Sequence, residues 1–356
     1  MKEKITNLEL TSTMFLLLFS CSLGLAPYIT IKIAGIDAYI GVMIGTLLGI
    51  IPLLLLLYLF NYEIDKPIYE KTKIIFGKIL GTIVNILLAI LYFAVAVTML
   101  FNMSNFIISQ YLTNTPIIIV IIIISLVIFF SLNKGIPAIT KTSCIYVIII
   151  IILFILEVVG LIPEVKLDNL KPVLEYGIKS PTAAGILYSL LLTSPIYSLL
   201  IIPKKDIENN KKTNKYLFIS YIVISLMIFF ISLVTSSCLG KYLLELFQYP
   251  AYTTLKKISI FGFIDRIENF LSIQWILSSF ITITIPIFYI KGNKNNKILN
   301  LIIIALLIIV ASTIFKNNTT YNHYLITYYP YVFLILFIIH IIIFLTILIK
   351  KCIKRK

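Results

Sequence analysis

Ten long apolar stretches fill this chain, and they constrain its fold more than any other feature. A helix that crosses the hydrocarbon core of a bilayer needs about 20 residues, and most of the stretches can supply that length. The sequence therefore predicts an all-α membrane protein with about ten spans, built as one integral membrane domain over residues 1–356. The predicted spans cover residues 11–33, 38–60, 79–108, 116–132, 145–161, 183–202, 216–234, 269–290, 298–314 and 329–349.

Basic residues gather in alternate connections between these spans. The odd-numbered hydrophilic segments, counted from the N-terminus, hold 21 of the 30 Lys and Arg residues, and the even-numbered segments hold 9. Positively charged loops stay preferentially on the cytoplasmic side of a membrane. Both termini are therefore predicted to be cytoplasmic.

The composition agrees with a membrane protein. Hydrophobic residues make up 60% of the chain and its mean hydropathy is +1.05, which leaves too little polar cover for a soluble particle of 356 residues. The net charge of +15 comes largely from short loops such as residues 204–215 and from the tail 350–356. Anionic lipid headgroups of the inner leaflet are thus the expected partner, and nucleic acid is not.

Residues typical of enzymes are scarce. The chain has two histidines, His323 and His340, and it carries no H-E-x-x-H, P-loop or G-x-S-x-G motif. The four cysteines form no C-x-x-C pair and are interpreted as packing residues. We therefore predict no catalytic residue, no metal site and no cofactor, and we interpret His340 as a hydrogen-bonded structural residue.

The N-terminus permits a second interpretation. Residues 18–21 loosely resemble a lipoprotein cleavage site that follows an apolar run. A phenylalanine before the small residue fits that site poorly, and Glu3 and Glu9 are unexpected in a basic leader. An uncleaved first span is the favoured interpretation.

Two features of the second span and the loop after it predict local structure. Gly41, Gly45 and Gly49 recur at every fourth position, which would let a neighbouring helix approach closely. Residues 67–78 mix isoleucines and lysines, which suits a short helix on the inner membrane surface, although an ordinary solvated loop is nearly as compatible with this composition.

Spans one and six are interrupted at their centres. Small polar residues lie beside a proline in residues 21–27 and again in residues 193–195. Proline removes a backbone donor and clashes with the preceding turn, so backbone groups are freed at membrane depth. If the ten helices are two inverted sets of five, these breaks are equivalent and mark a central substrate site. A half-helix N-terminus there would attract a carboxylate. A simple proline kink is the alternative.

An ordered series of short motifs resembles the spore germination proteins that form the B subunits of germinant receptors, also called endospore germination permeases. The motifs follow one another over most of the chain. They are residues 76–81 before span three, Thr115 and Pro116 at span four, residues 170–174 after span five, Tyr249 and Pro250, and residues 262–270 with Trp275 at span eight.

This resemblance implies a ten-helix fold of the amino acid, polyamine and organocation transporter superfamily, with inverted repeats and broken helices one and six. It also implies a location in the inner membrane of a dormant spore. There the subunit would sense a small-molecule germinant, commonly an amino acid, beside an A subunit and a lipoprotein C subunit. Binding would trigger germination.

The family's pocket lies among spans one, three, six and eight, and we transfer it only to matching residues. The predicted ligand-binding residues are Ser22, Gly24, Tyr92, Ser194 and Thr282. Tyr92 could instead be a buried aromatic residue, and the Thr282 hydroxyl could bond to its own helix. Trp275 is expected to pack or to form part of the site wall.

Three observations refine the resemblance. Family members often carry a basic residue late in span three, where this chain has Asn102, so any ion pair there is lost. Asp265, Arg266 and Glu268 are expected to form an ion-pair cluster at the outer end of span eight. Glu157, near the outer end of span five, is expected to snorkel to the surface.

The proposed lining is uncharged, which favours a small neutral amino acid as the ligand. Two other functions stay open. The chain could be a permease that translocates its ligand, or a structural subunit with a vestigial site. The same pocket would serve a receptor or a permease, because ligand binding can bias a conformational equilibrium without a complete transport cycle.

Overall fold

The computed structural model describes residues 4–175, 177–256, 266–292, 296–315 and 317–355, and in these it is almost entirely helical. No β-strand occurs among them, and one isolated bridge pairs Ile5 with Ile207. The helices are Asn7–Gly24 (α1), Ala26–Ala34 (α2), Ala38–Leu48 (α3), Ile50–Asn61 (α4), Ile68–Gln110 (α5), Ile117–Lys134 (α6), Ile136–Leu161 (α7), Lys179–Thr193 (α8), Thr213–Leu246 (α9), Pro250–Leu255 (α10), Glu268–Lys291 (α11), Lys297–Ile314 (α12), Asn318–Thr327 (α13) and Tyr329–Arg355 (α14).

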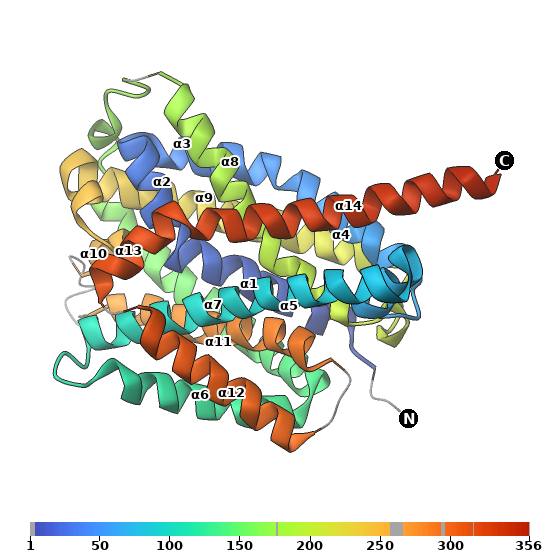
Figure 1. The fold of residues 1–356 in the computed structure, drawn as a ribbon. Helices are drawn as coiled ribbons and strands as arrows, with labels where there is room; N and C mark the ends of the chain where they lie inside the picture. Colours follow the sequence, from blue (N-terminus) through green and yellow to red (C-terminus); the bar gives the residue numbers. More distant parts are fainter. Residues whose placement is uncertain (1–3, 176, 257–265, 293–295, 316, 356) are drawn as a thin grey trace.

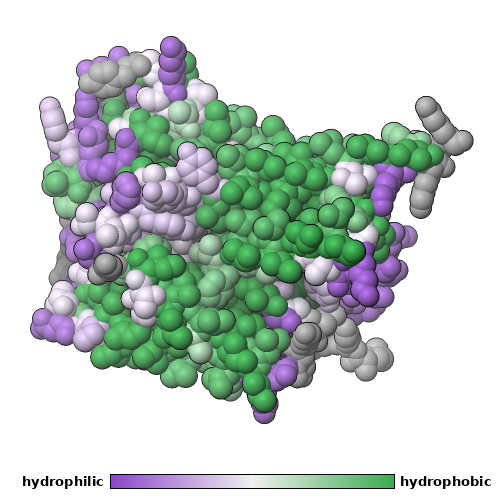
Figure 2. Space-filling model, in the orientation of Figure 1, coloured by the Kyte–Doolittle hydropathy of each residue, from purple (hydrophilic) through white to green (hydrophobic). Residues whose placement is uncertain are grey.

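Within these residues, ten helical segments are long and apolar enough to cross a membrane, which confirms the predicted fold class. The first of these segments is Asn7–Gly24 and the second is Ala26–Asn61, so the division falls at the break between α1 and α2. Predicted span one corresponds to α1 with α2, predicted span two to α3 with α4, and span ten to α13 with α14. In span six, α8 continues into the 3₁₀ helix Ser194–Ile201 (η4). The helices run along one bundle with both chain termini toward the same end (Figure 1). A broad hydrophobic surface covers its middle and polar residues gather toward the ends (Figure 2), as expected where lipid is the solvent.

Several contacts between the spans are paired. When each span in one of these contacts is replaced by the span five places before or after it, the result is another observed contact. Span two (α3) packs on span six (α8), and span seven (α9) packs correspondingly on span one (α1). Span five (α7) packs on span eight (α11), and span ten (α14) packs on span three (α5). Spans three and eight contact each other, as do spans four and nine. This is the pattern that two structurally equivalent sets of five helices produce.

Several spans begin or end away from their predicted bounds. Helix α7 begins at Ile136, nine residues before the predicted start, because Pro137 suits the first turn of a helix and the polar residues that follow continue it. Helix α9 runs to Leu246, and its path changes at Gly240, whose φ is 69°. Apolar length alone did not reveal these polar helix ends.

The glycine stripe of span two lets a neighbouring helix approach closely, as predicted, and the structure shows that this helix is α8 of span six. A β-carbon on Gly45 would lie 2.6 Å from the carbonyl oxygen of Gly185 on α8. The relation is reciprocal, since a β-carbon on Gly185 would lie 2.9 Å from the carbonyl oxygen of Gly41. Small residues on both helices thus let their backbones approach.

The segment before span three is a helix, so the alternative of an ordinary loop was wrong. It forms the first part of α5 and is separated from the spanning part by Gly77, whose φ of 82° favours glycine. Asn85 joins the two parts, because its Nδ2 donates to the carbonyl of Tyr69 at 2.8 Å and its Oδ1 accepts from Thr72 at 2.8 Å. The position of this helix on a membrane surface stays a prediction.

Lys71 in this first segment of α5 is buried, with 2% of its surface exposed. Its Nζ donates to the carbonyl of Leu59 at 2.8 Å. Leu59 lies in the last turn of α4, where carbonyls lack partners within the helix and where a cation is favourable. Burial lowers the pKa of Lys71 to about 8, below the ordinary value of 10.5.

The stability of the protein should therefore rise between about pH 8 and pH 10.5. In that window the unfolded chain still binds a proton at Lys71 that the folded chain has released. Raising the pH across it therefore increases the free energy of unfolding by about 3 kcal/mol. Lys71→Met should flatten this part of the profile of apparent Tm against pH, measured on the purified protein. Lys73→Met, which changes an exposed lysine of the same helix, should retain it. An equally steep Lys71→Met profile would contradict this assignment.

Candidate ligand site at the break in the first span

The break in span one follows from two adjacent residues. Helix α1 ends at Gly24, and Leu25 has φ of −121° and ψ of −45° before α2 begins. Pro27 has no N–H, so the carbonyl of Leu23 loses its helical donor. The backbone of residues 23 and 24 therefore offers acceptors at the centre of a span, as the sequence predicted.

Asn102 of α5 reaches this break. Its Nδ2 donates to the carbonyl oxygen of Gly24 at 3.2 Å, and the residue is 1% exposed. Its Oδ1 is buried and has no hydrogen-bond partner among the described residues. Asn102 therefore presents one free acceptor beside the break.

Trp275 of α11 covers the other side of Gly24. A β-carbon on Gly24 would lie 2.4 Å from Trp275 Nε1, so only glycine leaves room for the indole ring. Phe106 and Tyr249 hold this ring, with centroids 4.4 Å and 5.4 Å from it. The indole N–H is buried and has no partner in the described part of the chain. Trp275 thus packs directly against the break, as expected from the sequence.

A narrow cavity with an empty volume of about 420 Å³, its opening included, adjoins the same break. Ser22, Pro27 and Thr30 line it from span one, Tyr188 from α8, and Thr235 from α9. Ser22 Oγ donates to the carbonyl of Leu18 at 2.8 Å and accepts from the Tyr188 hydroxyl at 3.2 Å. Helices α1, α2, α8 and α9 thus meet at a partly polar space.

Span six is not broken in the same manner. The α-helix changes at Ser194 to the tighter 3₁₀ helix η4, and all residues of η4 are buried. Ser194 Oγ donates to the carbonyl of Phe333 on α14 at 3.3 Å. Tyr188, the partner of Ser22, precedes Ser194 by six residues, or roughly 9 Å along a helix. Ser194 thus bonds to span ten rather than to the break in span one.

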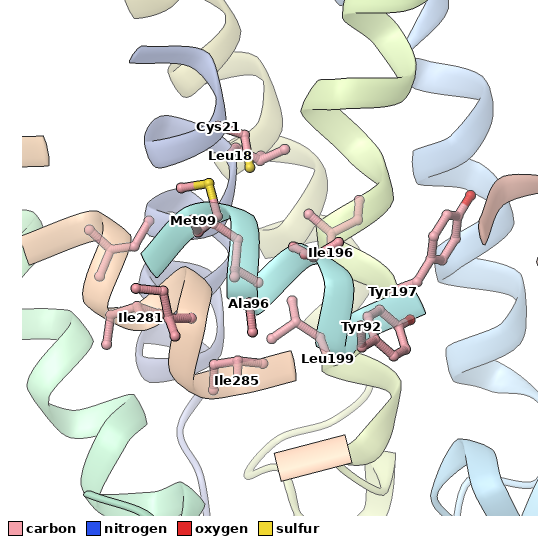
Figure 3. Packing of buried hydrophobic residues seen from close by; sticks show 14 of the residues in the cluster. Leu18, Cys21, Tyr92, Ala96, Met99, Ile196, Tyr197, Leu199, Ile281 and Ile285 are labelled. Carbon is pink, nitrogen blue, oxygen red and sulfur yellow. The ribbon is translucent and has the colours of Figure 1, made fainter. Parts of the chain in front are cut away.

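Tyr92 and Thr282 lie further along their helices from the break, and Thr282 is seven residues, or roughly 10 Å, beyond Trp275 on α11. Tyr92 is fully buried, packs on Tyr289 with ring centroids 4.8 Å apart, and leaves its hydroxyl without a partner among the described residues. Ten residues separate it from Asn102 on α5, or roughly 15 Å. In Figure 3, Tyr92, Ala96 and Met99 follow one another along this helix within an apolar cluster. Thr282 Oγ1 donates to the carbonyl of Ser278 in its own helix at 3.1 Å.

Tyr92→Phe distinguishes these two positions along α5. The hydroxyl bonds to nothing described in the protein, so its removal should leave the abundance of the folded protein unchanged. We expect a smaller loss of ligand-induced thermal stabilisation than Asn102→Leu produces, because Asn102 contacts the break and Tyr92 does not. Thermal unfolding of each purified variant, with and without a small neutral amino acid, measures this. A larger effect of Tyr92→Phe would place the ligand beside Tyr92.

Of the predicted site residues, Ser22 and Gly24 lie at the break, Tyr92 and Thr282 lie further along their helices, and Ser194 bonds to span ten. The roles of Ser194, Tyr92 and Thr282 in binding stay predictions. Sequence reasoning missed Asn102 and Tyr188 as partners of the break. An asparagine within an apolar span was the available signal for Asn102, whereas nothing in the sequence linked Tyr188 to Ser22.

The other predicted polar groups have mixed outcomes. Arg266 Nε lies 3.4 Å from Glu268 Oε1, in accordance with the predicted ion pair, while Asp265 lies outside the described residues. His340 is buried, with its Nδ1 2.7 Å from the carbonyl oxygen of Leu336, as expected of a structural histidine. The snorkelling expected of Glu157 was wrong, because this side chain is 3% exposed and bonds to Gln274.

Residues 4–321 match the model of the spore germination protein family. The chain belongs to this family. Spore germination protein XB of Bacillus anthracis is 23% identical over 282 residues, which cover 76% of this chain and 78% of the relative. Spore germination protein KB of Bacillus subtilis (strain 168) is 25% identical over 282 residues, covering 77% and 74%. Membership in this permease family and the ten apolar helices make the chain an integral multi-pass membrane protein.

Solved structures offer a weaker comparison. Crystal structures of two single-residue mutants of an Eremococcus coleocola manganese transporter show 14% sequence identity to this spore germination protein, with TM-scores of 0.44 and 0.45. Each alignment covers 98% of this chain and 72% of the transporter. A likeness of this size carries no argument about substrate.

Proposed function

We propose that this chain is the transporter-like subunit of a spore germinant receptor, which binds a small neutral amino acid beside Gly24 and thereby triggers germination. One observation carries the proposal. At the break in span one, a free acceptor on Asn102 and a free indole N–H on Trp275 adjoin the same glycine, and both are buried. A buried polar atom without a partner costs about 1–3 kcal/mol, so a ligand that satisfies both is favoured.

The chemistry of these groups supports an amino acid. An α-ammonium group needs acceptors, which Asn102 Oδ1 and the carbonyl of Leu23 would provide. A carboxylate needs donors, and the Trp275 N–H would provide one. The described residues that line the adjacent cavity include no charged side chain, so they favour a ligand whose own side chain is neutral.

Family membership supports the proposed receptor partners and location. The similarity to germination proteins supports assembly with A and C subunits in the spore inner membrane. The excess of lysines in odd-numbered segments supports cytoplasmic termini and contact with anionic lipids.

Binding would act by shifting a conformational equilibrium. Trp275 occupies the space beside Gly24, so a ligand enters only when this ring moves. The ligand would stabilise the conformation with the displaced ring, by an amount equal to its preference for that state. Helix α11, which carries Trp275, contacts α1, α5 and α7, so a shift there would reach the helices around it.

Direct binding tests the proposal. The purified chain should gain thermal stability with a subset of small neutral amino acids and none with lysine or glutamate, and Asn102→Leu should abolish that gain. The control Asn300→Leu removes another buried asparagine, whose Nδ2 donates to Asn133, and should leave the gain intact. Equal stabilisation of wild type and Asn102→Leu would contradict the assigned site.

Transport is the alternative function, and a flux assay separates it from sensing. Proteoliposomes that contain the wild-type chain should bind the stabilising amino acid without accumulating it. Uptake above that of empty liposomes, lost in Asn102→Leu, would identify a permease instead.

A further inference from the structure

Glu157 is a buried acid without a cationic partner among the described residues. It lies on α7, in span five, and its Oε1 accepts a hydrogen bond of 2.8 Å from Gln274 Nε2 on α11. Gln274 is fully buried, and its Oε1 has no hydrogen-bond partner in the described part of the chain. The amide therefore satisfies one oxygen of the acid and leaves its own oxygen unsatisfied.

This contact is one of the two hydrogen bonds that a carboxylic acid and a primary amide can form with each other. A carboxylic acid and a primary amide can exchange two hydrogen bonds, in which the amide N–H donates to the acid carbonyl and the acid O–H donates to the amide oxygen. The first bond is present here. Only a proton on Glu157 supplies the second, because an ionised carboxylate is an acceptor alone.

Glu157 also has access to a small cavity. A narrow space lies among α7, α9, α10 and α11, with an empty volume of about 310 Å³ that includes its opening, and Glu157 lines it together with Thr235, Ala251 and Leu271. The lining is otherwise apolar apart from Thr235, which makes an isolated carboxylate unfavourable there. Ile231, Thr235 and Ala251 also line the cavity beside Ser22, so the two spaces adjoin.

We propose that Glu157 and Gln274 form a proton-binding site between spans five and eight. A hydronium ion that reaches the cavity transfers its proton to the Glu157 carboxylate and leaves as water. The new O–H donates to Gln274 Oε1. Release reverses these steps, and one negative charge then returns to the space between α7 and α11. Trp275 follows Gln274 in the same helix. A change in the protonation of Glu157 therefore acts, through Gln274, on the residue that covers Gly24.

No charged or titratable group on the surrounding described elements neutralises the Glu157 carboxylate in place of a proton. Among the described residues, none other than Glu157 lines this cavity. Glu268 of α11 lies 3.4 Å from Arg266, and Lys241 of α9 lies 2.8 Å from Glu175. The other titratable groups on these elements do not line the cavity. They are Glu9 and Cys21 of α1, Lys134 of α6, Lys141, Cys144 and Tyr146 of α7, Glu164 after α7, Lys215, Tyr216, Tyr221, Cys238, Tyr242 and Glu245 of α9, Tyr252 of α10, and Tyr289 and Lys291 of α11.

Infrared spectroscopy of the full chain in phosphatidylcholine vesicles tests this site. A protonated carboxyl has a C=O band that an ionised one lacks. We expect a band equivalent to one carboxyl to persist at neutral pH, to disappear in Glu157→Gln, and to remain in Glu164→Gln, which changes an exposed acid after the same helix.

A second variant keeps the test independent of folding. Gln274→Leu retains the acid and removes its partner, so the band should remain and move to higher frequency as the hydrogen bonds are lost. Circular dichroism and size-exclusion chromatography report whether each variant is folded. A neutral-pH band that is the same in folded wild type and Glu157→Gln, or the absence of such a band from wild type, would overturn the proposal.

Discussion

Gly24→Ala should abolish the germination response, because the structure has no space for a methyl group at this position. A β-carbon there would lie 2.4 to 2.6 Å from three atoms of the Trp275 indole. Overpacking of a filled core typically costs about 1–3 kcal/mol, and the cost rises when the neighbour cannot move. Displacing the indole to make room for the methyl group would disrupt its packing against Phe106 and Tyr249.

A compensating change makes this prediction specific. Trp275→Leu removes the ring that the new methyl group meets, so Gly24→Ala combined with Trp275→Leu should recover receptor abundance that Gly24→Ala loses. Immunoblots measure abundance, and nutrient dose response measures function. The double variant should still respond poorly, because it lacks the indole N–H. Equal losses of abundance in the single and double variants would show that Gly24 is required for another reason.

Asn102→Leu should raise the half-maximal germinant dose by about 10- to 100-fold at normal receptor abundance. The change removes the acceptor proposed for the ligand's ammonium group and the donor to the Gly24 carbonyl. Hydrogen bonds to charged groups contribute about 1.5–3 kcal/mol, and each 1.4 kcal/mol is tenfold in affinity.

Asn300→Leu is the matched control for this measurement. It replaces an equally buried asparagine on α12, whose Nδ2 donates to Asn133 Oδ1 instead of to the break in span one. We expect its dose response to match wild type after correction for abundance. A parallel shift in both variants would mean that the loss of a buried asparagine, wherever it lies, lowers receptor performance, and the assigned role of Asn102 would then fail.

The site was predictable where it depends on local backbone chemistry. Pro27 and its small neighbours predict the break in span one, since a missing N–H frees a carbonyl whatever surrounds it. Pro195 predicted an equivalent break, but η4 accommodates it by tighter helical turns, within a fully buried environment. Whether a proline opens a helix or tightens it depends on the neighbours that satisfy the backbone.

Side-chain partners were beyond the reach of sequence. Asn102 and Gly24 are 78 residues apart, and Glu157 and Gln274 are 117 apart. Glu157 was expected at the surface because its position along span five is near an end, whereas the helices around it bury it. Tyr92 was placed beside the break because it lies near the middle of its span, but α5 is long enough to hold it roughly 15 Å from Asn102.

The sequence by itself determined the number of spans, the membrane environment and the family, because these depend on apolar length, on the distribution of charge and on an ordered set of short motifs. Only the tertiary structure decided which buried polar groups meet. Helix rotation and displacement along the bundle set those contacts, and both follow from packing against several neighbours at once, such as the close approach of α3 and α8 at Gly45.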